Sequence, residues 1–465
     1  MTLAAPLRAV QSARFAIHNP FSGAVVGELP QASEAEIRAC VLRAKAAAAG
    51  FRPSTPYQRR DLLNRLADLV ARDAEALAQL VCAEMGKTIT EARNELRRAQ
   101  TTLRLSGDAA TFLDGEVMQC AIVAGGVDRQ AVVSLAPTGV VAAITPFNYP
   151  VNLLCHKLGP AIGAGNAVVV KPSPKAPLAA DHLVRLTVEA GFPDHLVQIV
   201  HGGAEAALAL ARAPIDLLSF TGGPQAGLAL KRESGLVRCL MELGGNDPLI
   251  VLPDADLAAA AATAMGHRYE IAGQSCAAVK KLYVHQDIAG AFTECLLAGV
   301  AAHRFGDPAS PDTQMGPVID LAAAEEIMLR LSEAQAQGAR LLAGGTRTGT
   351  LIAPTVVSEV SPAMKLVAEE TFGPVLALRP FADLDTAMAE INGSDYGLQA
   401  GIFSNDHAAI RTLTRGLQVG GIMVNEGPDF RAEHVPFGGI KRSGLGREGV
   451  RIAMREMSEP RVVID

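Results

Sequence analysis

The spacing of apolar residues follows two different rhythms along the chain. Between residues 33 and 112 they recur every three or four positions, the period of one helix face. Ser33–Glu36 has the form of a helix start, a hydroxyl cap followed three residues later by an acid. We therefore predict a helix from Ser33, one helix over Gln58–Met85 and another over Thr90–Phe112. Residues 1–32 are expected to be extended and rich in turns.

From residue 139 the rhythm changes to short apolar runs separated by helical segments. The predicted strands are Gly139–Thr145, Ala167–Pro172, Val197–Val200, Asp216–Thr221 and Val237–Leu243. Strands that are apolar throughout are buried on both faces, which is typical of a doubly wound parallel sheet covered by helices. A second α/β unit is expected from about residue 248 to about residue 435. Ala131–Leu135 and Arg461–Ile464 are β-like and lie outside both units.

Composition describes an ordinary globular protein. The 465 residues are too many for one simple core, and 49% hydrophobic against 19% charged residues gives no sign of disorder. A net charge of -6 with no Lys/Arg run argues against broad nucleic-acid binding. The seven scattered cysteines, with no CxxC pair and no signal-like start, favour the reducing cytoplasm. No apolar run reaches membrane-spanning length, and the histidines show no metal-ligand spacing.

Cys276 is the candidate nucleophile. A single cysteine is more often an inert core thiol, but this one follows a Gly-Gln-Ser loop, where a thiol can face a cleft. A thiolate attacks an aldehyde carbon readily. Asn148, held between aromatic residues and prolines, is a candidate oxyanion donor, although alone it would be read as a turn residue. Glu242 ends an apolar strand before paired glycines, where it could act as a base toward water; the alternative is an ordinary charged residue at a strand end.

The stretch Phe220–Gly227 lies between a predicted strand and a helix. Backbone N–H groups at such a helix start can hold a diphosphate, although the spacing is not G-x-G-x-x-G. Lys171–Ser173 ends another strand, where a cation can reach a ribose or a phosphate.

Taken in order, these motifs resemble the aldehyde dehydrogenase superfamily over nearly the whole chain. The motifs that carry the resemblance are Pro146–Asn148, Lys171–Ser173, Phe220–Gly222, Glu242–Gly245, Gly273–Cys276, Glu369–Pro374 and Pro436–Gly444. The resemblance implies that the Cys276 thiolate attacks the aldehyde, that Asn148 stabilises the oxyanion, and that hydride passes to a nicotinamide. Glu242 then activates the water that hydrolyses the thioester. Relatives that acylate coenzyme A usually lack this glutamate, so its presence favours a free acid as product.

The resemblance also implies the cofactor site. The residues expected to bind NAD or NADP are Thr145, Pro146, Lys171, Ser173, Phe220, Gly222, Gly223, Gly227, Leu243, Glu370 and Phe372. NAD-preferring relatives often carry a glutamate three positions after the lysine, where this chain has Pro174 followed by Lys175. Loss of that carboxylate removes repulsion against a 2′-phosphate, and Lys175 would attract one. NADP use is therefore plausible, and NAD is not excluded.

Three residues point to a small anionic aldehyde. Arg98, Tyr149 and Arg431 match positions that hold the substrate phosphate in non-phosphorylating glyceraldehyde-3-phosphate dehydrogenases, and Arg suits such a group. The wider sequence looks closest to phosphonoacetaldehyde and lactaldehyde dehydrogenases. Ser275 stands where many anion-using relatives have Arg, which makes a carboxylate- or hydroxyl-bearing aldehyde competitive. Lactaldehyde, glyceraldehyde 3-phosphate or a semialdehyde is the alternative substrate, and a non-catalytic member of the fold is the alternative from another class.

The expected fold is α/β, with a Rossmann-like dinucleotide-binding domain, an α/β catalytic domain and a small β bridging element. We predict the first domain over residues 1–116 and 138–244 and the second over residues 245–455. Residues 117–137 and 456–465 are expected to form the bridging element of a homodimer or homotetramer.

Overall fold

The computed structural model describes residues 13–465. Two antiparallel strands, β1 (Arg14–His18) and β2 (Val25–Pro30), come first and are joined by a turn at Asn19, whose side-chain oxygen accepts from two backbone N–H groups of the turn. This confirms the extended, turn-rich prediction for residues 13–32, and the rest of that prediction lies outside the described residues.

The first of the helices that follow begins at its predicted cap. Helix α1 (Glu34–Phe51) starts with a complete capping box at Ser33, and α4 (Ile89–Ala110) matches the helix predicted over residues 90–112. The prediction of one helix over residues 58–85 was wrong. The structure has α2 (Pro56–Arg72) and α3 (Ala74–Met85), separated at Asp73 (φ -95°, ψ 10°).

The break at Asp73 coincides with a tertiary contact of the Asp73 side chain. The Asp73 carboxylate binds the side chains of Arg72 (2.7 Å) and of His182 (2.8 Å), which belongs to a distant helix. The apolar period continues on both sides of the break, so the sequence pattern alone cannot reveal it.

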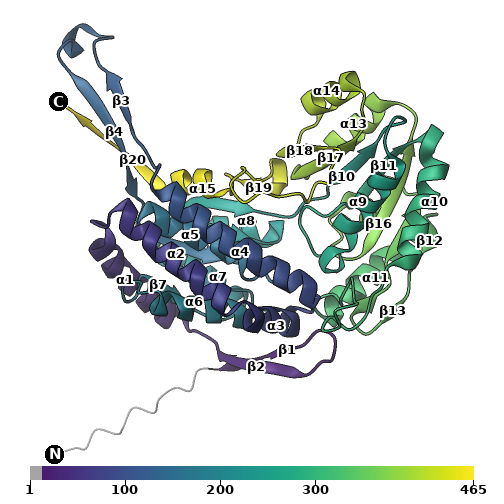
Figure 1. The fold of residues 1–465 in the computed structure, drawn as a ribbon, viewed down its shortest axis with the longest axis horizontal. Helices are drawn as coiled ribbons and strands as arrows, with labels where there is room; N and C mark the ends of the chain where they lie inside the picture. The colour runs from purple at the N-terminus through teal and green to yellow at the C-terminus, as the bar shows by residue number, and fades with distance from the viewer. Residues whose placement is uncertain (1–12) are drawn as a thin grey trace, which may run out of the picture.

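A six-stranded sheet forms the first lobe (Figure 1). Its parallel strands are β5 (Val140–Ile144), β6 (Ala167–Lys171), β7 (Val197–Ile199), β8 (Leu217–Thr221) and β9 (Arg238–Glu242), and β19 (Gly444–Leu445) joins β9 antiparallel. The connecting helices are α5 (Asn152–Ala164), α6 (Leu178–Glu189), α7 (Ala204–Arg212) and α8 (Pro224–Ser234). The order β19-β9-β8-β5-β6-β7 puts the first parallel strand in the middle, which confirms the doubly wound sheet.

A seven-stranded sheet, ordered β12-β15-β16-β11-β10-β17-β18, forms the second lobe (Figure 1). Its strands are β10 (Pro248–Val251), β11 (Lys281–His285), β12 (Arg340–Ala343), β15 (Thr355–Ser358), β16 (Val375–Phe381), β17 (Gln399–Phe403) and β18 (Gly421–Val424). All pairs are parallel except β12 with β15. Its helices are α9 (Leu257–Tyr269), α10 (Gln286–Ala302), α11 (Leu321–Ala336), α12 (Lys365–Ala368), α13 (Leu384–Asn392) and α14 (His407–Gly416).

The third sheet projects from the first lobe (Figure 1). Strand β4 (Gln130–Pro137) pairs antiparallel with β3 (Glu116–Gln119) on one side and with β20 (Ser458–Ile464) on the other. The two segments predicted as a bridging element therefore join within one chain, through helix α15 (Val450–Glu456), which packs on α4 and α5. The division into domains and the role of this sheet between subunits remain predictions.

None of the helices in residues 13–465 is long and apolar enough to cross a bilayer.

Candidate active site

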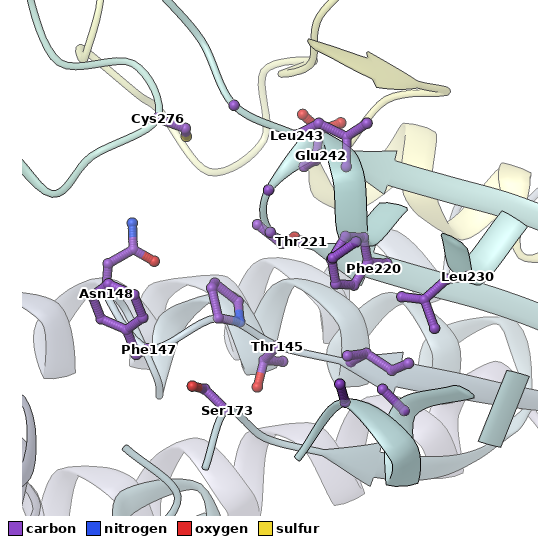
Figure 2. Close-up of a pocket in the computed structure, with 18 of the residues that line it drawn as sticks. Thr145, Phe147, Asn148, Ser173, Phe220, Thr221, Leu230, Glu242, Leu243 and Cys276 are labelled. Carbon is purple, nitrogen blue, oxygen red and sulfur yellow. The ribbon is translucent and has the colours of Figure 1, made fainter. Parts of the chain in front are cut away.

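A cavity of about 500 Å³ opens at the carboxyl ends of the parallel strands β5, β6, β8 and β9 (Figure 2). Among the residues that line it are Thr145, Pro146, Asn148, Lys171, Ser173, Phe220, Gly222, Gly223, Glu242, Leu243, Cys276, Glu370 and Phe372. The three predicted catalytic residues thus reach one cavity from three separate segments. Ligands of doubly wound sheets bind at this edge, where the strand order reverses.

The loop before Cys276 has an unusual backbone. Ile271, Ala272 and Gly273 all have positive φ (45°, 55° and 72°), a conformation that costs free energy for the two residues with a Cβ. Gln274 holds the loop: its side-chain amide donates to the Ile271 carbonyl (3.0 Å), and its side-chain oxygen accepts from the Ile319 N–H (2.9 Å). These contacts fix the position at which the thiol meets the cavity.

Cys276 is half-buried and packs near Ala277, Leu398 and Phe437. Burial raises the pKa of its thiol, and the nearby Lys280 ammonium opposes this without reversing it. The resting thiol is therefore protonated near neutral pH, so a base must take its proton before it can attack.

Asn148 approaches the same loop from the other side. Its side-chain amide donates to the Gln274 carbonyl (2.9 Å), and its side-chain oxygen accepts from the Tyr149 N–H (3.2 Å). In Figure 2 the amide nitrogen points toward the Cys276 side of the cavity. Because an amide carries two N–H donors, one of them is left over for a ligand.

Glu242, the last residue of β9, is only 3% exposed, and its Oε2 has no hydrogen-bond partner. Burial raises the pKa of this carboxyl well above its usual value, and the negative charge of Glu448 adds to the effect, against Arg431 and Lys157. Its other oxygen lies against Gly438, where a Cβ would stand 2.6 Å away. A carboxyl with a raised pKa suits proton transfer near neutral pH.

The cofactor side of the cavity has an unpaired cation. Burial lowers the pKa of Lys171 to about 8, and within residues 13–465 its ammonium has no hydrogen-bond or ion-pair partner. Nearby, α8 begins at Pro224 with Gly223 as its N-cap, so no side chain occupies the N–H groups of the first turn. Both features suit a phosphate or ribose.

At two positions next to this region, a Cβ would clash with a neighbouring side chain, so a glycine is needed. A Cβ on Gly244 would lie 2.0 Å from the Glu370 carboxylate, which accepts from the Gly245 N–H (3.2 Å). Gly227 does not line the cavity; it lets α8 approach Leu243, which a Cβ there would meet at 2.7 Å. Gly227 therefore has a packing role, and its contact with the cofactor stays a prediction.

Lys175 does not behave as predicted. Its ammonium pairs with Asp320 at 2.6 Å and is not part of the cavity wall, whereas Pro174 is. Asp320, a residue of the second lobe, thus competes with a 2′-phosphate for Lys175 through a partly exposed ion pair.

The four predicted substrate residues lie outside the cavity wall. Tyr149 follows Asn148, and the Arg98 guanidinium lies 5.7 Å from its ring. Ser275 is 2% exposed. The Arg431 side chain is 9% exposed, donates to Glu448 (2.9 Å) and stacks on Phe437 at 4.3 Å. Arg431 is therefore not the free cation that the sequence suggested.

The sequence reading missed the groups behind Glu242 and Arg98. Lys157 Nζ donates to Glu448 (2.9 Å), Thr221 (2.8 Å) and Ser219 (3.2 Å), all buried. Glu433 binds Arg98 (2.7 Å) and His156 (2.6 Å). The available signal was a cluster of polar residues, His156 and Lys157, inside an otherwise apolar helix.

Comparison with known proteins agrees with this site. Residues 8–463 match the Aldehyde dehydrogenase family. The chain is 38% identical to a sulfoacetaldehyde dehydrogenase of Neptuniibacter caesariensis, over 97% of this chain and 99% of the relative. It is 32% identical to a lactaldehyde dehydrogenase of Methanococcus aeolicus, with 96% of each covered.

Among solved structures, an NADP-dependent glyceraldehyde-3-phosphate dehydrogenase of Bacillus halodurans C-125, complexed with NADP, superposes with a TM-score of 0.95. Its identity is 35%, over 97% of this chain and 95% of that one. Fold, cavity and sequence agree: the chain belongs to the aldehyde dehydrogenase family and is an oxidoreductase that acts on aldehydes.

Proposed function

We propose that this protein oxidises a small anionic aldehyde to the free carboxylic acid with NAD or NADP, through a thioester on Cys276. The observation that carries the proposal is the shared cavity: a thiol, an amide donor and a buried carboxyl meet there with an unpaired lysine and an open helix start.

In the first half of the reaction, Cys276 loses its proton and its sulfur forms a bond to the aldehyde carbon. Glu242 is a candidate base on the cavity wall, since its raised pKa makes its carboxylate a stronger proton acceptor than an ordinary glutamate, and it passes this proton to solvent before the second half. The carbonyl oxygen becomes an anion, which accepts from the spare N–H of Asn148. Loss of hydride from the same carbon gives the thioester.

In the second half, a water molecule attacks the thioester carbon and the C–S bond breaks. Glu242, ionised again after the first half, accepts the proton of the attacking water and returns it to the departing sulfur, which restores the Cys276 thiol. The acid is released, and no coenzyme A is needed.

The cavity wall fits a nicotinamide dinucleotide. Lys171 would hold a ribose hydroxyl or a phosphate, Gly222 and Gly223 would let backbone approach the diphosphate, and Glu370 would hold the second ribose. When bound, the nicotinamide ring supplies the hydride acceptor. Pro174 on the wall leaves room for a 2′-phosphate without a repelling carboxylate, so we expect NADP to be accepted as well as NAD.

For the substrate, Arg98 is the better cation for an anionic group, because its paired side chain is still 27% exposed whereas that of Arg431 is 9% exposed. Relatives named for sulfoacetaldehyde and lactaldehyde support a small polar aldehyde. A phosphonate such as phosphonoacetaldehyde, a sulfonate and a carboxylate share the chemistry that Arg98 would recognise.

The test is an absorbance assay of reduced nicotinamide with the purified protein. Phosphonoacetaldehyde, sulfoacetaldehyde, succinic semialdehyde, lactaldehyde and glyceraldehyde 3-phosphate are each supplied with NAD and with NADP, and the product is identified by mass spectrometry. We expect the free acid from at least one anionic aldehyde without added coenzyme A. No reduction with any aldehyde would refute the proposal and favour a non-catalytic member.

We also propose that the projecting sheet joins subunits of a homodimer or homotetramer. Its strands expose apolar side chains, among them Val117, Met118, Val462, Val463 and Ile464, and its two edges are unpaired within the described chain. Light scattering of the full chain against Val463→Asp tests this: a smaller assembly is expected for the variant, and an unchanged mass would contradict it.

A further inference from the structure

Glu433 binds Arg98, the predicted substrate cation whose guanidinium lies 5.7 Å from the ring of Tyr149, the residue after Asn148. Its Oε1 accepts from Arg98 Nε at 2.7 Å, and its Oε2 contacts His156 Nε2 at 2.6 Å. The Glu433 side chain is 6% exposed and the His156 side chain is fully buried, whereas 27% of Arg98 is exposed. The pair Glu433–His156 therefore lies behind Arg98, on the protein side.

The contact uses one particular nitrogen of the guanidinium. Arg98 donates through Nε, and within residues 13–465 its two terminal nitrogens have no hydrogen-bond partner. A guanidinium that is anchored at Nε has its terminal fork fixed in direction, and such a fork matches the oxygens of a carboxylate, sulfonate or phosphonate.

Protonation states follow from the same contacts. Burial acts to raise the pKa of Glu433, but the His156 contact and the two arginines outweigh it and lower the pKa to about 2, so the carboxylate stays ionised. Burial lowers the pKa of His156, which is therefore neutral and must carry its proton on Nε2 to donate to a carboxylate. Its other ring nitrogen is buried without a partner.

Carboxyl groups offset the cations around this pair. Arg98, Arg431 and Lys157 face two ionised carboxylates, Glu433 and Glu448, with His156 neutral. Two further carboxyls, Glu270 and Asp429, interact with Tyr149 and Arg98 and oppose an anion there. Anion binding here thus depends on the direction in which the Arg98 guanidinium is held.

We propose that Glu433 is a positioning residue for substrate specificity: held by His156, it fixes Arg98 so that the terminal fork receives the anionic group of the aldehyde. The inference rests on the proposed function and adds the residue pair that makes one arginine sufficient where two cations were expected. A competing role, in which Glu433 occupies the anion site itself, disagrees with its contact at Nε and its burial behind the guanidinium.

The experiment compares KM and kcat for succinic semialdehyde, which is anionic, with those for pentanal, a neutral aldehyde of similar length. We expect Glu433→Ala to raise KM for succinic semialdehyde about tenfold, the size of a lost charge-assisted contact, and to change KM for pentanal less than about twofold. Glu433→Gln, which keeps an acceptor for Nε, should retain most of the preference. Arg98→Lys, which cannot be anchored in this way, should behave like Glu433→Ala.

Glu75→Ala is the matched control, because it removes the partner of Arg93, another arginine of α4, in an exposed pair. It should leave both KM values unchanged. His156→Leu should reproduce a smaller part of the Glu433→Ala effect and serves as the second variant if Glu433→Ala does not fold.

Three outcomes would overturn the inference. A lower KM for succinic semialdehyde in Glu433→Ala would mean that Glu433 competes with the anion. Equal effects on both aldehydes would mean a structural role only. If the wild-type enzyme showed no preference for succinic semialdehyde over pentanal, Arg98 would not be a receptor for the anionic group. A wild-type protein that oxidises neither aldehyde, nor any in the wider panel, would instead refute the proposed function.

Discussion

The cofactor side and the substrate side of the active site differ in whether their cations are paired with carboxylates. On the cofactor side, Lys171 is a buried cation that has no partner within residues 13–465, on a wall that also carries Thr145, Ser173 and Glu370. On the substrate side, Arg98, Arg431 and Lys157 are each bound to a carboxylate. A group left unpaired on folding is kept for a ligand, because its desolvation is offset only when the ligand arrives. A paired group is mostly committed to the protein.

The nucleophile gives the largest expected effect. Cys276→Ala should lower kcat to below about one thousandth, because no other thiol reaches the cavity and the covalent step is lost. The exposed Cys295→Ser is the control and should keep full activity. Steady-state reduction of NADP measures both, and substantial turnover by Cys276→Ala would contradict the covalent mechanism.

Glu242 comes next, because it is the carboxyl shared by both halves of the reaction. We expect Glu242→Gln to lower kcat by about 10² to 10⁴, the range for loss of a general base. If its main task is hydrolysis, the variant will accumulate an acyl adduct on Cys276, visible as added mass in the intact protein. A variant with unchanged kcat would show that another group activates water.

Lys171 tests the unpaired side of the comparison. Lys171→Met should raise KM for the cofactor about tenfold to a hundredfold, since a charge-assisted contact is lost, and leave KM for the aldehyde unchanged. The wild-type pKa of about 8 adds a pH signature. Below it the ammonium is charged and binds; above it the neutral amine binds a phosphate poorly, so cofactor KM should rise between about pH 8 and 9. A flat profile would argue against a charged contact.

Glu270 gives the smallest effect and tests the paired side. Burial, with Asp429 and Glu91 nearby, raises its pKa to about 7. Below pH 7 the carboxyl is neutral; above pH 7 it is charged and repels an anionic aldehyde. We therefore expect KM for succinic semialdehyde to rise roughly fivefold from pH 6 to pH 8, as for about 1 kcal/mol of like-charge repulsion. Glu270→Gln should flatten this rise, and KM for pentanal should not change with pH in either enzyme.

The sequence was most informative where local rules decide the structure. Ser33 caps a helix as predicted, and the strands β5, β6, β8 and β9 lie within one or two residues of their apolar runs. Cys276, Asn148 and Glu242, each ambiguous alone, were found together because their motifs occur in family order, and the fold places all three on one cavity wall.

Charged residues were harder to interpret. Arg431 and Lys175 were predicted to be free cations. Each is instead paired with a carboxylate from another segment of the chain: Arg431 with Glu448 and Lys175 with Asp320. Asp73, which divides a predicted helix, does so while bound to His182, 109 positions away. No periodicity or motif encodes such a pairing.

The sequence by itself thus determined the family, the doubly wound sheet and the three residues that reach the reaction centre, because apolar period, caps and motif order are local properties of the chain. Tertiary structure decided which charged side chains remain available to a ligand. It paired Lys175 and Arg431 with carboxylates, left Lys171 without a partner in the described chain, and placed Glu433 behind Arg98. The physical reason is that the ability of a charged side chain to bind a ligand depends on its ion-pair partner and on its burial. Both arise only when distant segments pack together.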